Sequence, residues 1–476
     1  MTSVDLAVLV IYLTGTAAFG VWVGRRRRTS DGFMSAGRCV PGWAVGLSIL
    51  GTYVSSISFL ALPSKAFAED WNTFVFSLAL PPAMWIAVRH FVPFYRASGA
   101  LSAYEHLERR FGPWARTYAA ACYLLTQIAR VGTILYLLAL ALAPLTGWSV
   151  PTLVLVAGLL ALAYTIYGGI EAVIWTDVVQ SIVFVAGAAV CIWVIVVGLP
   201  DGMGELLRTA ADANKFSLGS LSVDVRLSTV WVVLLYGLFI NLQNFGIDQN
   251  YVQRYLTARS EGDARRSVWI GGWIYVPLSA VFLFIGTGLF AFYAARPERL
   301  PSGLASTPDA VFPHFIATEL PIGVAGLVIA SLFAAAQSTV STSINGAATL
   351  LLCDVYARYV RPAAGERERM AVLRAASLLF GVAGMAAALA MMRMRSALDA
   401  WWQLASIFSG GMLGLFLLGR LSSRPRNAHA MMATGTGVAA ILWLTFRPVV
   451  HPNLIIVIGT VTIMLVGFAL IALPKR

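Results

Sequence analysis

The chain has 476 residues, of which 59% are hydrophobic and only 12% are charged, and its mean hydropathy is +0.77. A soluble domain carries about 25% charged residues, so this composition excludes an ordinary soluble protein and indicates an integral membrane protein. The formal net charge is +12, but the basic residues are divided among many short loops, which argues against a nucleic-acid-binding surface.

A membrane-spanning helix needs roughly 20 mostly apolar residues, and about 13 segments of the chain meet that requirement. The expected spans are residues 3–24, 42–66, 71–95, 117–147, 149–167, 171–199, 227–254, 267–293, 320–350, 368–395, 401–420, 428–446 and 452–473. The loops between them are too short for a folded extramembrane domain, so we expect one all-α integral membrane domain over residues 1–476. Neither an enzyme motif nor a feature that demands an obligate protein partner is visible.

The basic residues fall in every second loop, and the loops between are acidic or neutral. By the positive-inside rule this alternation predicts an N-terminus outside the cell and a C-terminus in the cytoplasm. The basic clusters are residues 25–28, Arg109 with Arg110 and Arg116, Arg254 with Arg259, Arg265 and Arg266, residues 358–374, Arg420 with Arg424 and Arg426, and Lys475 with Arg476.

Two of the expected spans contain polar interruptions. Residues 51–58 read GTYVSSIS, and residues 241–250 read NLQNFGIDQN. They lie five spans apart, as expected if two five-helix inverted repeats each begin with a helix that is broken near the bilayer midplane. We therefore expect repeats over about 42–199 and 227–420, with the helix at 3–24 before them and extra helices at 428–473 after them. The alternative is that Ser and Gly merely allow close helix packing.

The stretch FAAAQSTVSTSIN at residues 333–345 carries many hydroxyl groups within an apolar span. On a helix Ser338, Ser341 and Thr342 share one face, and Thr339 borders it. Single hydroxyls can bond to the carbonyl of the preceding turn, but a cluster of hydroxyl oxygens suits a hard cation. An ion site is therefore favoured over helix packing alone, with carbonyls of the broken second span as further ligands.

Asp177 and Arg130 are charged residues inside apolar spans, where charge is costly and usually functional. Asp177 is either a cation ligand near the hydroxyl cluster or the structural partner of a buried arginine. Arg130 could bind an anionic substrate through its fork of donors, pair with Asp177, or hold a helix carbonyl. Glu171 lies nearer the cytoplasmic end and is expected at a gate or a surface contact.

Several longer stretches resemble the sodium:solute symporters, whose fold is LeuT-like. They are VPGWAVGLS from Val40, GGIEAVIWTDVVQS from Gly168, VQRYLTAR from Val252 and FAAAQSTVSTSIN from Phe333. Within the family, SAYEHLERRFG from Ser102 and IARV around Arg130 are similar to the bacterial sodium-coupled sialic acid symporters.

The resemblance implies two sodium sites and a substrate site. The first sodium site uses the backbones of Gly51, Val54 and Ala335 and the side chains of Ser338 and Thr339. The second uses Asp177, Ser338, Ser341 and Thr342. The substrate carboxylate is held by Arg130 with Ser55 and Ser58. Tyr53 and Ser77 line the pocket where those relatives have Thr and Gln, and Asn250 replaces an Asp, a change expected to concern the cytoplasmic side.

The sequence therefore predicts a sodium-coupled symporter in the bacterial inner membrane that imports a small organic acid by alternating access. Sialic acid (N-acetylneuraminate) or a related carboxylated sugar is the leading substrate, with two sodium ions carried per acid. Two sodium ions per monoanion move one positive charge inward, which adds about 2.3 kcal/mol per 100 mV. The alternative is a symporter for a neutral sugar, amino acid or vitamin in which Arg130 is structural; a sensor and a channel are the other classes.

Overall fold

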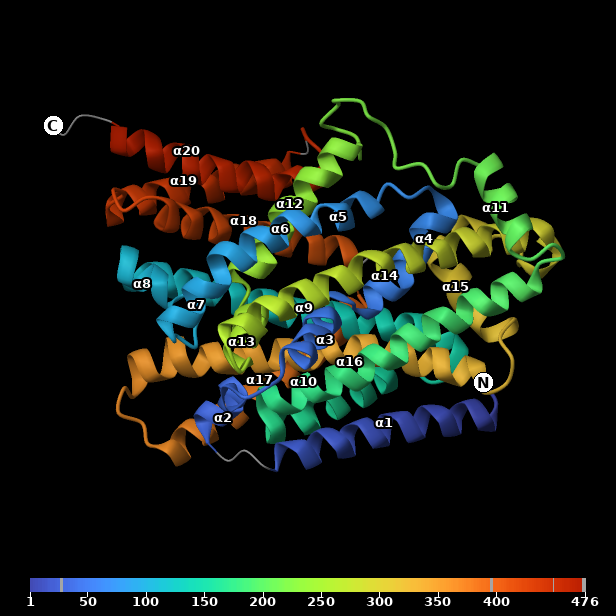
Figure 1. The fold of residues 1–476 in the computed structure, drawn as a ribbon, viewed down its shortest axis with the longest axis horizontal. Helices are drawn as coiled ribbons and strands as arrows, with labels where there is room; N and C mark the ends of the chain where they lie inside the picture. The colour runs from blue at the N-terminus through green and yellow to red at the C-terminus, as the bar shows by residue number, and fades with distance from the viewer. Residues whose placement is uncertain (26–28, 394–396, 448, 473–476) are drawn as a thin grey trace.

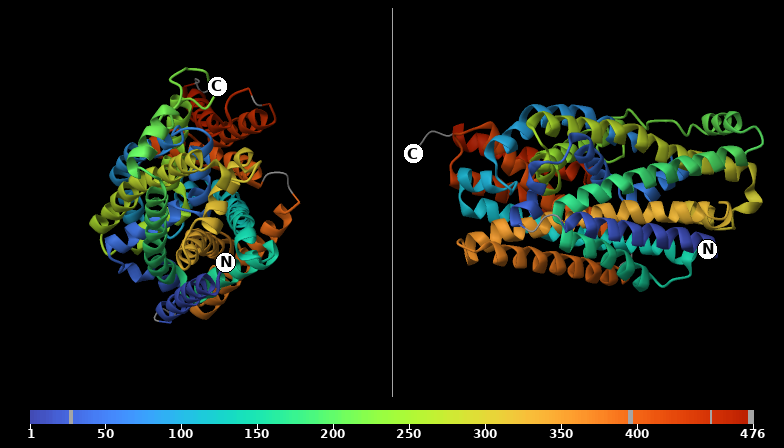
Figure 2. Two further views of the ribbon diagram at one scale, coloured as in Figure 1. Left: turned by 90° about the vertical axis from the view of Figure 1, so that its right-hand side faces the viewer. Right: turned by 60° about the horizontal axis from the view of Figure 1, so that its bottom comes forward.

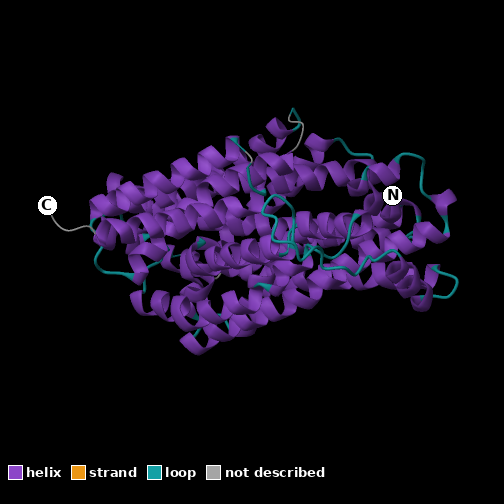
Figure 3. Cartoon of the chain, turned by 90° about the horizontal axis from the view of Figure 1, so that it is seen from above, coloured by secondary structure: helices purple, strands orange, loops and turns teal. Residues whose placement is uncertain are grey.

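The computed structural model describes residues 1–25, 29–393, 397–447 and 449–472, and within these ranges it is built of helices and connecting loops (Figures 1 and 3). Some expected positions lie outside the described residues, namely 26–28, 475 and 476 of the basic clusters and the last residues of the expected spans 368–395 and 452–473. The helices are α1 (Ser3–Gly24), α2 (Ser30–Ser35), α3 (Gly42–Tyr53), α4 (Ser56–Ala68), α5 (Phe74–Leu78), α6 (Leu80–Ile86), α7 (Val92–Ser98), α8 (Glu105–Phe111), α9 (Pro113–Thr146), α10 (Val150–Gly198), α11 (Met203–Asp212), α12 (Val230–Ile247), α13 (Gln249–Thr257), α14 (Glu261–Ala295), α15 (Pro308–Thr318), α16 (Val324–Leu350), α17 (Glu366–Met391), α18 (Ala397–Leu421), α19 (Asn427–Phe446) and α20 (Ile455–Ala472).

The membrane-spanning helices follow the expected apolar segments. Among the described residues ten helices are long and apolar enough to cross a membrane, or up to eleven if the bent pair α3 and α4 is one span. The expected number of about 13 is therefore not confirmed. Both segments expected at 149–167 and 171–199 lie in α10, and Gly169 interrupts its helical geometry with φ 55° and ψ −151°.

Gly169 is required at that interruption. A positive φ is open to glycine at little cost, and a Cβ there would lie 2.5 Å from the Phe33 carbonyl oxygen. The two parts of α10 can therefore take different directions while α2 packs closely against the point where they meet.

The molecule is elongated, and its termini lie at opposite ends. The first residues of α1 lie at the right-hand end in Figure 1, whereas α20 ends at the left. The right-hand view of Figure 2 shows the same separation. Because most of the long helices run along this axis, the two ends correspond to the two sides of a membrane.

Helix α16 forms the centre of the bundle. It packs against α1, α9, α10 and α17, and every residue from 328 to 350 is buried. A helix that is surrounded on all sides by other helices cannot leave its hydroxyl groups to bulk water or lipid, so their partners are protein groups or bound ligands.

Both predicted interruptions are present as breaks between helices. Helix α3 ends at Tyr53, Val54 has an extended backbone (φ −81°, ψ 118°), and α3 meets the following helix at 54°. Helix α12 ends at Ile247, and Asp248 is extended before α13 begins. Helix α13 packs against both α3 and α16, so the second broken segment contacts the first (Figure 1). The proposed bounds of the two repeats stay a prediction.

Candidate functional site

The break between α3 and α4 faces the hydroxyl cluster of α16. The Thr339 hydroxyl donates to the carbonyl oxygen of Val54 at 3.4 Å and to that of Ala335 at 3.3 Å. All three residues are buried. An extended residue at the end of α3 thus turns its carbonyl toward a hydroxyl of the central helix, which gives a group of oxygens of the kind that an alkali cation needs.

Gly51 allows α3 to approach this group closely. A Cβ at Gly51 would lie 2.6 Å from the Ser338 hydroxyl oxygen and 3.5 Å from the Cβ of Asp177. Helices α3, α10 and α16 therefore meet at a point where a larger residue would force Ser338 away. The structure brings together all the residues that the resemblance assigns to the first sodium site.

Asp177 lies beside the same point, and its side chain is fully buried. Ser338 donates a hydrogen bond to its Oδ1 at 2.7 Å, and Ser48 of α3 donates to its Oδ2. The ion-pair partner of Asp177 is Arg254 on α13, whose Nη2 lies 2.8 Å from Oδ2. From the sequence, Asp177 is interpreted either as a cation ligand or as the partner of a buried arginine. The structure contains such an arginine, Arg254.

The prediction that Arg254 belongs to a cytoplasmic loop is wrong. Its side chain is 0% exposed. Its Nε donates to the Ser48 hydroxyl at 2.8 Å, its Nη2 to the Thr342 hydroxyl at 2.7 Å, and its Nη1 to the Asn250 carbonyl at 2.8 Å. The physical reason is that all nine residues of α13 are buried: the chain continues inside the molecule after the break at Asp248. A buried carboxylate needs a cation, and that requirement was the signal that could have led to Arg254.

Arg130 of α9 contacts the end of α3. Its Nη2 donates to the carbonyl oxygen of Thr52 at 3.2 Å, which is the third of the contacts considered for it. The guanidinium is half-buried and stands within one turn of the break. The Thr52 carbonyl lies two residues before Val54, and Ser55 follows directly after Val54. The assignment of Arg130, Ser55 and Ser58 to one substrate site stays a prediction.

The two serines begin α4. The Ser55 hydroxyl accepts a hydrogen bond from the backbone N–H of Ser58 at 3.3 Å and lies 3.5 Å from the Ser58 hydroxyl. This is an N-cap, which satisfies one of the free N–H groups at the start of a helix. The positive end of α4 lies at the break between α3 and α4.

Tyr53 joins the two broken helices. Its hydroxyl donates to the side-chain carbonyl of Asn241 on α12. Its ring lies 4.9 Å from that of Tyr275, 5.4 Å from that of Tyr251 and 5.7 Å from that of Phe245, measured between centroids. An aromatic wall therefore stands beside the proposed substrate site.

Ser77, the other departure from the relatives, is buried on α5, which packs against α12 and α14. Glu171 is half-buried two residues after Gly169. Asn250 is buried at the start of α13, where it accepts a hydrogen bond from the Tyr123 hydroxyl at 2.7 Å. Through this hydrogen bond the Asn250 side chain links α13 to α9. The expected effect of position 250 on the cytoplasmic side stays a prediction.

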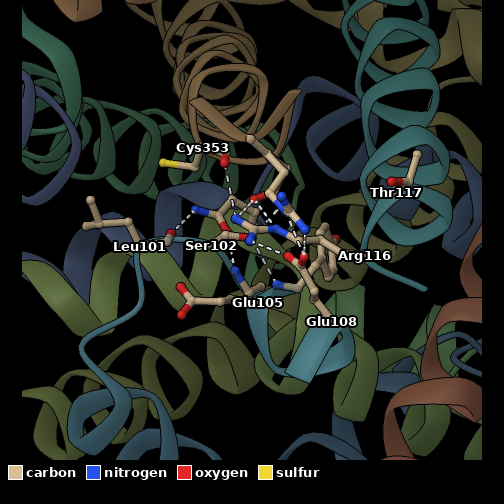
Figure 4. Close-up of polar contacts among 12 residues, drawn as sticks. Leu101, Ser102, Glu105, Glu108, Arg116, Thr117 and Cys353 are labelled. Carbon is tan, nitrogen blue, oxygen red and sulfur yellow. Dashed lines mark hydrogen bonds and ion pairs between the residues drawn. The ribbon is translucent and has the colours of Figure 1, made fainter. Parts of the chain in front are cut away.

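A second buried charge cluster lies at the end of the molecule where α20 ends (Figures 1 and 4). Arg116 of α9 pairs with Asp354, which follows α16, and with Glu108 of α8 at 2.8 Å. Arg358 also contacts Glu108, at 2.6 Å. Burial alone raises the pKa of Glu108, but the hydrogen bonds from Arg358 and Arg116 hold that pKa below its ordinary value.

Comparison with known proteins gives consistent matches over nearly the whole chain. The sequence model of the sodium:solute symporter family matches residues 33–437. A sodium/sialic acid symporter of Proteus mirabilis is 34% identical over 468 residues, which are 98% of this chain and 94% of the relative. A sodium/sialic acid symporter of Aliivibrio fischeri is 32% identical and covers 98% of this chain and 92% of its own length.

Solved structures agree with this assignment. A sodium-coupled sialic acid symporter in a substrate-bound, outward-open state superimposes with a TM-score of 0.93 at 32% identity, over 100% of this chain and 99% of that one. A nucleobase-cation-symport-1 family transporter in a closed conformation matches in fold alone, with a TM-score of 0.59 at 16% identity over 92% of this chain and 94% of that one. The predicted family and LeuT-like fold are confirmed: this chain belongs to the sodium:solute symporter family.

Proposed function

We propose that this protein is a sodium-coupled symporter of the bacterial inner membrane that imports sialic acid or a closely related carboxylated sugar. The observation that carries the proposal is the meeting of the α3–α4 break with α16, where the Val54 carbonyl, the Thr339 hydroxyl and the Ser338–Asp177 pair lie side by side. The nature of the relatives, which are sodium/sialic acid symporters, supports both the ion and the acid.

Two sodium ions are proposed per acid. The first binds the carbonyls of Gly51, Val54 and Ala335 and the hydroxyls of Ser338 and Thr339. The second binds Asp177 with the hydroxyls of Ser338, Ser341 and Thr342. A carboxylate at the second site neutralises the charge of an ion that is buried away from water. Carbonyl dipoles alone would stabilise that charge less.

The acid is proposed to bind at the start of α4. Arg130 supplies a charged donor, Ser55 and Ser58 supply hydroxyls, and the helix N-terminus adds a favourable dipole. Tyr53 and Ser77 then shape the part of the pocket away from the carboxylate. The Thr52 carbonyl that Arg130 now contacts is exchanged for the stronger, charged acceptor.

Sodium is proposed to bind first and to fix the α3–α4 break against Thr339. A fixed break places Ser55, Ser58 and Arg130 correctly for the acid, so each ligand raises the affinity for the other by the same factor. Alternating access then exposes the loaded site to the cytoplasm. The orientation that we propose has the N-terminus outside and the C-terminus inside, and the termini at opposite ends of the molecule are consistent with it.

A binding screen on purified protein in detergent tests this function. Sialic acids, other small carboxylates and neutral sugars are titrated in sodium chloride and, at equal ionic strength, in potassium chloride. We expect binding of a sialic acid in sodium only, together with a lower sodium midpoint when the acid is present. Equal binding in potassium would contradict the proposal.

The role of Arg130 has its own test. Arg130→Gln removes a charge-assisted hydrogen bond worth about 1.5–3 kcal/mol, so we expect acid affinity to fall roughly 10- to 100-fold. The thermal stabilisation by sodium should persist, because no proposed sodium ligand is altered. Unchanged acid affinity in this variant would make Arg130 a structural residue that holds the Thr52 carbonyl, as in a symporter for a neutral solute.

A further inference from the structure

We infer that Arg254 is a tethered cation that occupies the Asp177 site when sodium is absent, and that the second sodium ion binds by displacing its guanidinium. This inference rests on the proposed function, because it concerns how the proposed second sodium site fills and empties. It makes Arg254 a positioning residue for the sodium step.

Asp177 and Arg254 form a buried pair of opposite charges. The side chains of Asp177 and Arg254 are both 0% exposed, and their charged groups are 2.8 Å apart. A carboxylate without a cation is strongly unfavourable at such a place. A transporter that releases its sodium must nevertheless pass through a state in which the site holds no ion. The Arg254 guanidinium supplies the missing positive charge in that state.

The Arg254 guanidinium also occupies oxygens that are proposed to bind sodium. The Nη2 atom of Arg254 donates to Asp177 Oδ2 at 2.8 Å and to the Thr342 hydroxyl oxygen at 2.7 Å. Ser338 donates to Asp177, and Ser341 donates to the Ser338 carbonyl at 3.2 Å. Two of the four proposed sodium ligands therefore already accept hydrogen bonds from one nitrogen atom of the guanidinium.

Sodium and the guanidinium cannot share these oxygens. A guanidinium does not lose its proton in proteins, so it remains a full positive charge beside any ion that enters. One carboxylate then faces two cations in a water-poor site, where like charges repel strongly. The hydroxyls can rotate to offer lone pairs to sodium, but the guanidinium has to move away.

Arg254 lies on a short helix, α13, and connects it to three other helices. Helix α13 has nine residues and follows the extended Asp248. Through one side chain it is bound to Ser48 of α3, Asp177 of α10 and Thr342 of α16. Displacing the guanidinium therefore breaks hydrogen bonds from α13 to three helices at once. Occupation of the sodium site and the position of the second broken helix become coupled through this exchange.

Sodium titration of the thermal unfolding midpoint tests the inference on purified full-length protein. Potassium chloride keeps the ionic strength constant, and no acid is added, so the readout does not depend on transport. Arg254→Gln removes the competing charge but keeps a long polar side chain. We expect its sodium midpoint to fall about tenfold, equivalent to ~1.4 kcal/mol, and its stability without sodium to fall. Arg254→Lys keeps a cation and should have a midpoint near that of the unaltered protein.

The double variant Asp177→Asn with Arg254→Gln removes the second sodium site. It leaves no unpaired charge, so it should fold without sodium and respond only through the first site. An Arg254→Gln midpoint equal to or above that of the unaltered protein would overturn the inference. So would an Arg254→Gln protein that stays unfolded at every sodium concentration while the double variant folds, because sodium would then be unable to replace the guanidinium. Absence of any sodium response in the unaltered protein would instead overturn the proposed function.

Discussion

At the scale of single residues, the site depends on Asp177 and on the residues that contact it, because replacing any of them would displace its neighbours. Asp177 accepts hydrogen bonds from Ser338, Ser48 and Arg254, so its charge is balanced and both of its oxygens are satisfied. The neighbouring Gly51 contributes by lacking a side chain. The hydrogen bond from Ser338 to Asp177 therefore depends on Gly51. A side chain on α3 at that position would occupy the space of the Ser338 hydroxyl.

The Gly51→Ala variant tests this close approach. The new methyl group would lie 2.6 Å from the Ser338 hydroxyl oxygen, so Ser338 must turn away from Asp177 and from both proposed ions. We expect sodium affinity to fall at least about tenfold, equivalent to ~1.4 kcal/mol, as measured by sodium-dependent thermal stabilisation.

Gly435→Ala is the matched control, since nothing lies within 4 Å of a Cβ at that position on α19. It should leave the sodium response unchanged. A Gly51→Ala protein with the sodium affinity of the unaltered protein would show that Ser338 does not contribute to either ion site.

At the scale of helices, the two buried charge clusters have different partners. The cluster around Asp177 joins α3, α10, α13 and α16, two of which belong to broken helices. The cluster around Arg116 instead joins α8 and α9 to the continuation of α16. Asp354 in that second cluster also accepts a hydrogen bond from Ser102 at 2.7 Å, which fixes the loop before α8 (Figure 4).

The Asp354→Asn variant should destabilise the protein. It leaves the buried Arg116 with Glu108 as its remaining charged partner, and loss of one member of a buried ion pair costs about 3 kcal/mol of folding free energy. We expect a lower thermal unfolding midpoint in sodium-free and sodium-containing buffer alike, because Asp354 is not part of the proposed sodium sites.

Asp201→Asn provides the comparison. Asp201 pairs with Arg208 at 2.6 Å, but the two side chains are 69% and 68% exposed, and exposed pairs contribute about 0–1 kcal/mol. If Asp354→Asn and Asp201→Asn lowered the thermal unfolding midpoint equally, the buried ion pairs of Arg116 would contribute no more stability than an exposed pair.

At the scale of the whole molecule, the proposed stoichiometry sets the driving force. Two sodium ions carried with one monoanion move one net positive charge across the membrane. At 100 mV that charge is worth about 2.3 kcal/mol, or roughly a 50-fold change in the accumulation ratio. Coupling to a single sodium ion would make transport of a monoanion electrically neutral.

Uptake into proteoliposomes measures this directly. With a fixed inward sodium gradient, an inside-negative potassium diffusion potential should increase accumulation of the acid. Clamping the potential at zero with equal potassium on both sides should remove the increase, and Asp177→Asn should reduce it by weakening the second ion. Accumulation that does not depend on the potential would limit the protein to one sodium ion per acid.

Much of the fold and part of the site follow from the sequence. The spans can be predicted because a bilayer requires about 20 apolar residues in a row. The interruptions at residues 51–58 and 241–250 can be predicted because polar residues stand within such apolar stretches. Two further signals can be read from short stretches of the sequence, and both indicate the ion site. They are the hydroxyl cluster at residues 338–343 and the costly charge of Asp177 within an apolar span. The number of spans is not confirmed: the two segments expected at 149–167 and 171–199 lie in α10, which has a kink at Gly169.

The partners of the charged groups were decided by tertiary structure. Arg254 was expected with the basic loop residues, yet it pairs with Asp177, which lies 77 positions earlier. Arg130 contacts the end of α3 and Asn250 contacts Tyr123, and neither contact has a signature in hydropathy. The sequence alone determined where polar groups interrupt the apolar spans, because that is a local property. Only the packing of α13 against α3 and α16 decided which cation meets Asp177, because a long-range ion pair depends on how separate helices come together.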